Sequence, residues 1–311
     1  MIPPIYRFTM GLHPPARTIR AGDLVEVDLP DSDGLGPDLK QLPPSLFDLK
    51  PGGHFPGNPV YGPIAVRGAQ PGDALEVHFL HVQPNRSIAR TRIAPRHGYL
   101  PDHLLRDLRS VKAAPRRPTR MCLWKLGKTT ARLINPFGRR VPRVPIAPFL
   151  GCIGTAHPGR KPLSTLEAGS HGGNIDLPDL QVGTKLWLPV SVPGGLLYLG
   201  DMHAAQGQGE IVGGGLEVSG SVRIRVALKK NARLRHLRFR NSQGFGCVTP
   251  MASIEEGVRQ SLAELIQWHV EDGWDRNDAY MAISQSCEFH LGGVCSRYAV
   301  VACFVRENLV S

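Results

Sequence analysis

The chain has 311 residues, of which 41% are hydrophobic and 20% are charged; this excludes an intrinsically disordered protein and allows one large or two modest globular domains. It has no apolar run near the roughly 18 residues of a membrane-spanning helix, no signal-peptide core and no Cys-x-x-Cys pair among its six cysteines, so we predict a cytoplasmic protein with free thiols and no membrane partner. The formal net charge of +11 raises the question of an anionic partner. The distribution of the basic residues along the chain addresses that question.

The first part of the chain is predicted to be rich in β-strands. The 35 glycines and 28 prolines of the whole chain follow no period, which is typical of many turns between short strands. Residues 22–29 alternate polar and apolar side chains, residues 62–66 form an apolar run, and residues 74–80 follow a Pro-Gly turn at 70–73. We expect the first and last of these segments to lie in one sheet.

The segment 86–146 carries most of the excess charge, with 16 Lys and Arg residues against two acidic residues. We predict an irregular region over 84–146 that covers one face, with a short helix near 101–108. A second basic run, 223–240, has eight basic residues and no acidic one. Neither run has an aromatic stacking pattern, so we interpret them as solvated surface and predict no nucleic-acid partner.

The second part of the chain continues with strands and ends with helices. Strands are expected at 185–190, 196–199 and 221–228. Ser253 and Glu256 form a capping box for a helix that ends near Gly273. A second helix is expected from about Asn277 through 284, and an apolar strand at 298–304.

The fold class is therefore mainly β (α+β). Its two regions are an N-terminal β-rich region, 1–150, and a β-rich active-site region with C-terminal helices and a final strand, 151–311.

Two short polar patterns between residues 167 and 217 are candidates for chemistry. Asn174-x-Asp176 and Asp201-x-His203 each place two polar side chains on one face of an extended segment, and glycines surround both pairs. Zinc binds His nitrogen and carboxylate oxygen, whereas calcium or magnesium prefers the Asp, Asn and Glu oxygens. A carboxylate left without metal, such as Glu210, can accept a proton from water. Such pairs also occur in ordinary turns, so a purely structural role stays open.

The same residues resemble two sequence blocks of the acetamidase/formamidase family. Residues 170–176 are similar to its G-G-N-x-D block, and residues 200–210 are similar to its G-D-x-H-x-x-Q-G-x-G-E block. Further similarity lies at 62–66, 69–77 and 148–156, and the whole resemblance runs from about residue 22 to 305. It implies a β-rich fold with a C-terminal α/β portion, hydrolysis of small aliphatic amides such as formamide or acetamide, and divalent metal in some relatives.

The resemblance also implies a set of pocket residues, to which we assign roles in a preferred mechanism: Asn174, Asp176, Asp201, His203, Gln206 and Glu210. Glu210 is the expected base, with Asp201 as a second catalytic carboxylate. Asn174 and Gln206 are expected to orient the substrate. The expected ligands of a divalent metal, zinc rather than calcium or magnesium, are His203, Asp201, His171 and Asp176.

Several alternatives stay open at this stage. Arg67 and the segment 286–296 depart from the family pattern, so a lactam or another amide is a possible substrate. A non-catalytic protein that binds a small ligand or a metal is the other alternative. We expect the protein to form a homo-oligomer, a dimer. We expect its ligand to be a small amide substrate.

Overall fold

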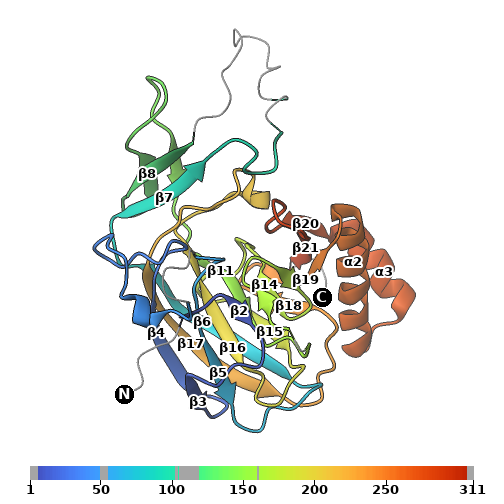
Figure 1. Cartoon of the computed structure of the whole chain (residues 1–311). Helices are drawn as coiled ribbons and strands as arrows, with labels where there is room; N and C mark the ends of the chain where they lie inside the picture. The colour runs from blue at the N-terminus through green and yellow to red at the C-terminus, as the bar shows by residue number, and fades with distance from the viewer. Residues whose placement is uncertain (1–5, 50–54, 102–103, 105–118, 160, 307–311) are drawn as a thin grey trace.

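The structure is a computed structural model that describes residues 6–49, 55–101, 104, 119–159 and 161–306. Two large sheets form the body, two helices cover one end, and a smaller sheet stands away from the body (Figure 1). The mainly β fold class is confirmed. Neither described helix combines the length and apolarity needed to cross a bilayer. All six cysteines are free thiols, as predicted.

The larger sheet has eight strands and mixes segments from both parts of the chain. The predicted strands 22–29 and 74–80 do share this sheet, with one strand from the second part between them. In spatial order the strands are β20 (Glu288–Leu291), β21 (Ala299–Arg306), β19 (Gly244–Met251), β18 (Leu237–Arg240), β15 (Lys185–Pro189), β6 (Ala74–Pro84), β17 (Gly220–Lys229) and β4 (Leu24–Leu29).

The second sheet has seven strands and carries the residues singled out by the sequence. Its order is β1 (Tyr6–Arg7), β5 (Val60–Val66), β16 (Leu197–His203), β11 (Phe149–Gly154), β14 (Gly172–Asn174) and β13 (Ala168–Gly169), with β3 (Arg17–Ile19) parallel to β5. Beside it β2 (Thr9–Met10) pairs with β12 (Leu163–Ser164), and η1 (Pro44–Leu46) is a single 3-10 turn. Both large sheets take strands from each side of residue 150, and the subdivision there stays a prediction.

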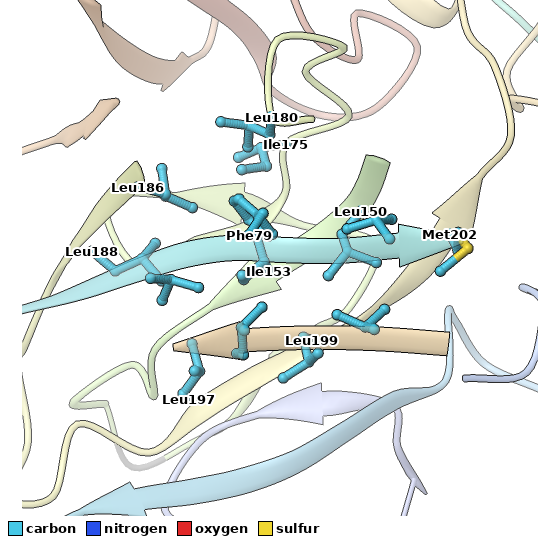
Figure 2. Packing of buried hydrophobic residues seen from close by; sticks show 14 of the residues in the cluster. Phe79, Leu150, Ile153, Ile175, Leu180, Leu186, Leu188, Leu197, Leu199 and Met202 are labelled. Atoms are coloured by element: carbon cyan, nitrogen blue, oxygen red, sulfur yellow. The ribbon is translucent and has the colours of Figure 1, made fainter. Parts of the chain in front are cut away.

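The core lies between the two large sheets. Phe79 of β6 and Leu188 of β15 face Leu150 of β11 and Leu199 of β16, all fully buried (Figure 2). Burial of one such side chain contributes roughly 1.5–3 kcal/mol. The central strands β11 and β16 are thus fixed from one side by packing, which leaves their other side for polar residues.

The C-terminal helices pack on the far face of the eight-stranded sheet. They are α2 (Ile254–Glu271) and α3 (Arg276–Ser286). Ser253 caps α2 at the predicted place, because its Oγ accepts a hydrogen bond of 3.1 Å from Glu256 N. The second helix begins slightly before the predicted Asn277, because Asp275 caps it.

The final strand β21 is buried on both faces, which explains its uninterrupted apolar sequence. Ala302 and Phe304 point into the core between the sheets, whereas Cys303 and Val305 pack in a second cluster with Leu265 of α2. Alternate residues of one strand therefore serve two cores.

The prediction of an irregular region over 84–146 is wrong for its described part. It contains a four-stranded antiparallel sheet of β7 (Ile88–Ile93), β8 (Arg120–Leu126), β9 (Thr130–Leu133) and β10 (Arg143–Pro145), seen at the top of Figure 1. Arginines occupy alternate positions of β7 and form its polar face. In the sequence these arginines made the segment look irregular and concealed the alternation of a strand. The helix predicted near 101–108 lies almost wholly outside the described residues.

A buried ion-pair cluster joins β18 to α2. Arg238 Nε donates to Glu264 Oε1 at 2.9 Å, and Arg238 Nη1 donates to Glu271 Oε2 at 2.6 Å. The side chains of Arg238 and Glu264 are only 5% and 6% exposed. Burial raises the pKa of Glu264, and the charge of Arg238 opposes that rise.

We predict that Arg238→Met destabilises the fold by about 3–5 kcal/mol, because it leaves Glu264 buried without its cation. Removing Arg238 raises the folded-state pKa of Glu264 further above its unfolded value. Stability from such a group is present at low pH and is lost as pH rises through the folded pKa, so the deficit is larger at about pH 7 than at about pH 5. Urea unfolding measures both. The double variant Arg238→Met, Glu264→Leu is the control and recovers much of the loss; equal deficits in both variants contradict the prediction.

Candidate active site

Three side chains of the two polar patterns converge over one glycine. Gly151 lies on β11, between β14 and β16. A Cβ atom added at Gly151 would stand 2.4 Å from Asp176 Oδ1, 2.9 Å from Asp201 Oδ2 and 3.0 Å from His203 Cε1. The two motifs therefore lie on strands separated by one further strand, and the absence of a side chain on that strand makes room for their polar atoms.

Three carboxylate residues of the cluster have left-handed backbone conformations. The φ angles are 45° at Asp176, 57° at Asp201 and 52° at Glu210. This conformation is uncommon for residues other than glycine and gathers at functional sites, where surrounding structure maintains it. The strain accordingly indicates a functional site in this part of the sheet.

The left-handed backbone at Asp201 changes which face of β16 the following side chains occupy. Leu197 and Leu199 point into the core, and strict alternation would place Asp201 there as well. Instead Met202 enters the core, and Asp201 lies with His203 beside Gly151. The prediction that Asp201 and His203 share one face is confirmed.

His203 is held in one orientation. Its ring stands edge-on to Phe149, with centroids 5.3 Å apart, and packs against Gly215. Its Nδ1 lies 2.8 Å from Gln206 Oε1, while Gln206 Nε2 donates to the carbonyl oxygen of Asp176 at 2.6 Å. Gln206 Oε1 therefore accepts the Nδ1 proton, and Nε2 faces the carboxylates. Because both ends of the Gln206 amide are engaged, it positions His203 rather than the substrate, unlike the role expected from the sequence.

Glu217 is a further member of the cluster. Its Oε1 lies 3.1 Å from His203 Nε2, and Asp201 Oδ1 lies 3.5 Å from the same nitrogen. The backbone of Glu217 is fixed by hydrogen bonds in both directions with Arg90 of β7, at 2.8 and 3.0 Å. The sheet of the basic segment thus holds a carboxylate of the site.

Acidic residues of the loop after β4 neutralise part of the basic segment. Arg86 Nη2 donates to buried Asp31 Oδ2 at 2.6 Å, and Arg90 Nη1 lies 3.7 Å from the same oxygen. Arg90 also pairs with Asp33. These arginines are internal partners, which corrects the expectation of a wholly solvated basic face.

The cluster has the donors of a metal site. Two groups have ligand atoms within 4.8 Å of one another, Asp176–His203–Glu210 and Asp201–His203–Glu217. Several buried atoms here have no hydrogen-bond partner: Asp176 Oδ1 and Oδ2, Asp201 Oδ1, His203 Nε2 and Glu217 Oε2. Unpartnered buried acceptors are costly, and a divalent cation satisfies them together. These residues can therefore hold a metal ion.

The ionisation of the cluster reflects burial and mutual repulsion. Burial first, and then the charges of Glu210 and Asp201, raise the pKa of Asp176 well above its ordinary value. Burial raises the pKa of Glu210 to about 7. Burial alone lowers the pKa of His203, but the charges of Glu217 and Asp201 raise it overall. A proton or a cation is needed to balance the charges.

A pocket of about 400 Å³ opens onto this cluster. Asn58 Nδ2 donates to Asn174 Oδ1 at 2.9 Å and to Asp201 Oδ2 at 2.7 Å, which fixes both residues at the pocket wall. Sequence reasoning missed Asn58, because it lies in a loop 116 residues from Asn174 and belongs to no motif. Glu217 lies outside both sequence blocks, although its nearness to the glycine-rich run offered a signal.

His171 lies apart from the cluster. Its ring is 6.0 Å from that of His157, and neither of its nitrogens has a hydrogen-bond partner. Burial and His157 lower the pKa of His171 to about 4. Since it belongs to neither metal-binding group of the described residues, the expectation that it ligates metal is not met. Gly172, the first residue of β14, has a φ of 95°, so the backbone changes direction directly after His171.

Known structures share this architecture. An acetamidase from Yersinia enterocolitica superposes with a TM-score of 0.81 at 30% sequence identity, over 99% of this chain and 90% of that chain. This chain belongs to the acetamidase/formamidase family. The family model, described as "Acetamidase/Formamidase family", matches residues 154–305 and so includes the motifs on β14 and β16.

Other members of the family show similar likeness. An acetamidase from Bacillus halodurans has a TM-score of 0.80 at 26% identity, covering 99% of this chain and 98% of that one. A formamidase of Methylophilus methylotrophus is 28% identical over 211 residues, which is 55% of this chain and 51% of that protein. The chain spans about half the length of the curated relatives it matches.

We predict that Gly151→Ala weakens metal binding by about 10-fold or more, because the new methyl group would stand 2.4 Å from Asp176 Oδ1. Calorimetric titration of chelator-treated protein with Zn²⁺ measures the affinity. The control is Gly138→Ala, where an added Cβ meets nothing within 4 Å. Equal affinities for the two variants count against a metal site over Gly151.

A second prediction concerns Gln206. Gln206→Met removes the acceptor for His203 Nδ1–H and should lower metal affinity by about 10- to 100-fold. In Gln206→Glu the acceptor remains, although the bond to the Asp176 carbonyl is lost. If both variants lose affinity equally, packing rather than orientation of His203 explains the effect.

Proposed function

We propose that this chain hydrolyses the C–N bond of a small linear amide to a carboxylate and ammonia. The observation that carries the proposal is the convergence of four carboxylates and His203 at a pocket, in a chain of the acetamidase/formamidase family. The relatives named formamidase and acetamidase support this reaction class.

Asp201, His203 and Glu217 form the group best suited to hold a divalent metal. All three have unpartnered buried atoms, and Gln206 already orients the imidazole. The nitrogen donor among carboxylates supports zinc ahead of calcium or magnesium. When bound, such a metal supplies Lewis acidity and lowers the pKa of water.

Two carboxylates of the cluster then remain outside this group. Asp176 is buried, whereas Glu210 lines the pocket and lies beside the reacting amide. Its pKa of about 7 suits a group that accepts and returns a proton near neutral pH. Glu210 accepts a proton from the attacking water as the C–O bond forms, and it donates that proton to the amide nitrogen as the C–N bond breaks. The products are the carboxylic acid, which ionises, and ammonia.

Asn174 orients the amide in this proposal. Its Oδ1 accepts from Asn58, so its NH₂ group is the end available to donate to the substrate carbonyl oxygen. A donor placed toward developing negative charge stabilises the transition state. Asn58 therefore supports both the substrate contact of Asn174 and the position of Asp201.

We predict that Glu210→Gln lowers kcat by about 10²- to 10⁴-fold while metal content stays near that of the wild type, because glutamine cannot accept the proton. Glu217→Gln should differ by losing metal together with activity. Ammonia release from formamide, acetamide and propionamide, measured beside metal analysis, separates the two roles.

The matched control is Glu255→Gln, a carboxylate 75% exposed on α2. If Glu210→Gln turns over amides at a near-normal rate, a residue other than Glu210 is the base. Absence of ammonia from every amide with metal-loaded wild type contradicts the proposed function and favours a binding protein.

A further inference from the structure

The pocket is far larger than the smallest amides. Its volume is about 400 Å³, whereas one water occupies about 30 Å³ in the liquid and formamide has only three non-hydrogen atoms. Beyond the site carboxylates, one part of the wall is apolar and includes Phe55, Leu166 and Met121. A ligand with a longer carbon chain fits this space.

The remaining wall is charged and includes Asp33. Arg90 and Arg92, on alternate residues of β7, both line the pocket. Their acidic partners are few: Asp31 is shared by Arg86 and Arg90, and Asp33 is shared by Arg90 and Arg92. Three guanidinium groups thus face two carboxylates within this network, which leaves one positive charge in excess.

The excess lies at Arg92. Arg86 and Arg90 are 3% and 14% exposed and make the closest contacts with Asp31 and Asp33. Arg92 is 53% exposed, and its Nη2 lies 3.4 Å from a carboxylate that Arg90 already binds. Arg92 is accordingly the guanidinium best able to accept a ligand carboxylate, in the planar two-bond geometry typical of arginine.

We propose that the preferred substrate is an amide that also carries a carboxylate, such as the monoamide of a short dicarboxylic acid. Its amide lies at Asn174 and Glu210, its methylene chain follows the apolar wall, and its carboxylate pairs with Arg92. This inference rests on the proposed function for the reaction itself, but the anion contact at Arg92 is separate from it.

The charge distribution argues for a single, distant anionic group. Asp201, Glu210 and Glu217 line the pocket and repel a carboxylate placed directly beside the amide. Arg92, which lines the same pocket, attracts one. The pocket therefore distinguishes the two ends of such a substrate and selects its orientation.

Succinamate and 4-oxopentanamide test the proposal, because they have similar shapes and differ in the charge at the end remote from the amide. We expect kcat/KM for succinamate to exceed that for 4-oxopentanamide by about 10-fold or more, with the difference mainly in KM. In Arg92→Gln this ratio falls toward one, and in Arg92→Lys part of it returns. The control Arg225→Gln, an exposed arginine of β17 outside the pocket, keeps the wild-type ratio.

Binding measured by calorimetry keeps the two proposals distinguishable. In a Glu210→Gln background, succinamate should bind about 10-fold more weakly when Arg92 is also replaced by Gln. Equal kcat/KM for the two amides, or a ratio that Arg92→Gln leaves unchanged, overturns the anionic substrate while amide hydrolysis stands. If no amide is hydrolysed, the proposed function fails, and the binding comparison alone decides whether Arg92 receives a carboxylate.

Discussion

Buried carboxylates without hydrogen-bond donors impose the main constraint on this structure. Asp176 and Asp201 sit in the interior. Among the described residues, both oxygens of Asp176, Oδ1 of Asp201 and Nε2 of His203 have no hydrogen-bond partner, and only Asp201 Oδ2 accepts a bond, from Asn58. Such groups destabilise a fold unless a cation or protons balance them. The scaffold must therefore hold them together against repulsion, and several of its local features are explained by that requirement.

The packed sandwich supplies the rigidity. Strand β16 is buried along its whole length. Leu197, Leu199 and Met202 face the core, and Asp201 and His203 face the site. Changing the left-handed backbone at Asp201 would rotate either Met202 out of the core or His203 out of the site. Packing and site geometry thus maintain the same strained residue, and Gly151 on the next strand accommodates the result.

Local patterns predicted the parts of the fold that depend on local physics. The alternation of residues 221–228, the helix cap at Ser253 and the Asp201-x-His203 pair all appear in the structure as expected. Parts that depend on distant partners were not predictable. Gln206 is oriented by a carbonyl 30 residues away, and Asn58 acts through side chains that only the folded sheet brings near.

The basic segment shows the same limit for electrostatics. Its charge was visible in the sequence, but the partners of Arg86 and Arg90 lie more than 50 residues earlier, in a loop without periodicity. Once paired, these arginines no longer form a uniform basic face. They attach the small sheet to the body, fix the backbone of Glu217 and leave Arg92 at the pocket with the surplus charge. One network of ion pairs therefore connects the position of a site carboxylate with the polarity of the pocket. A change in the loop that carries Asp31 and Asp33 would alter both together.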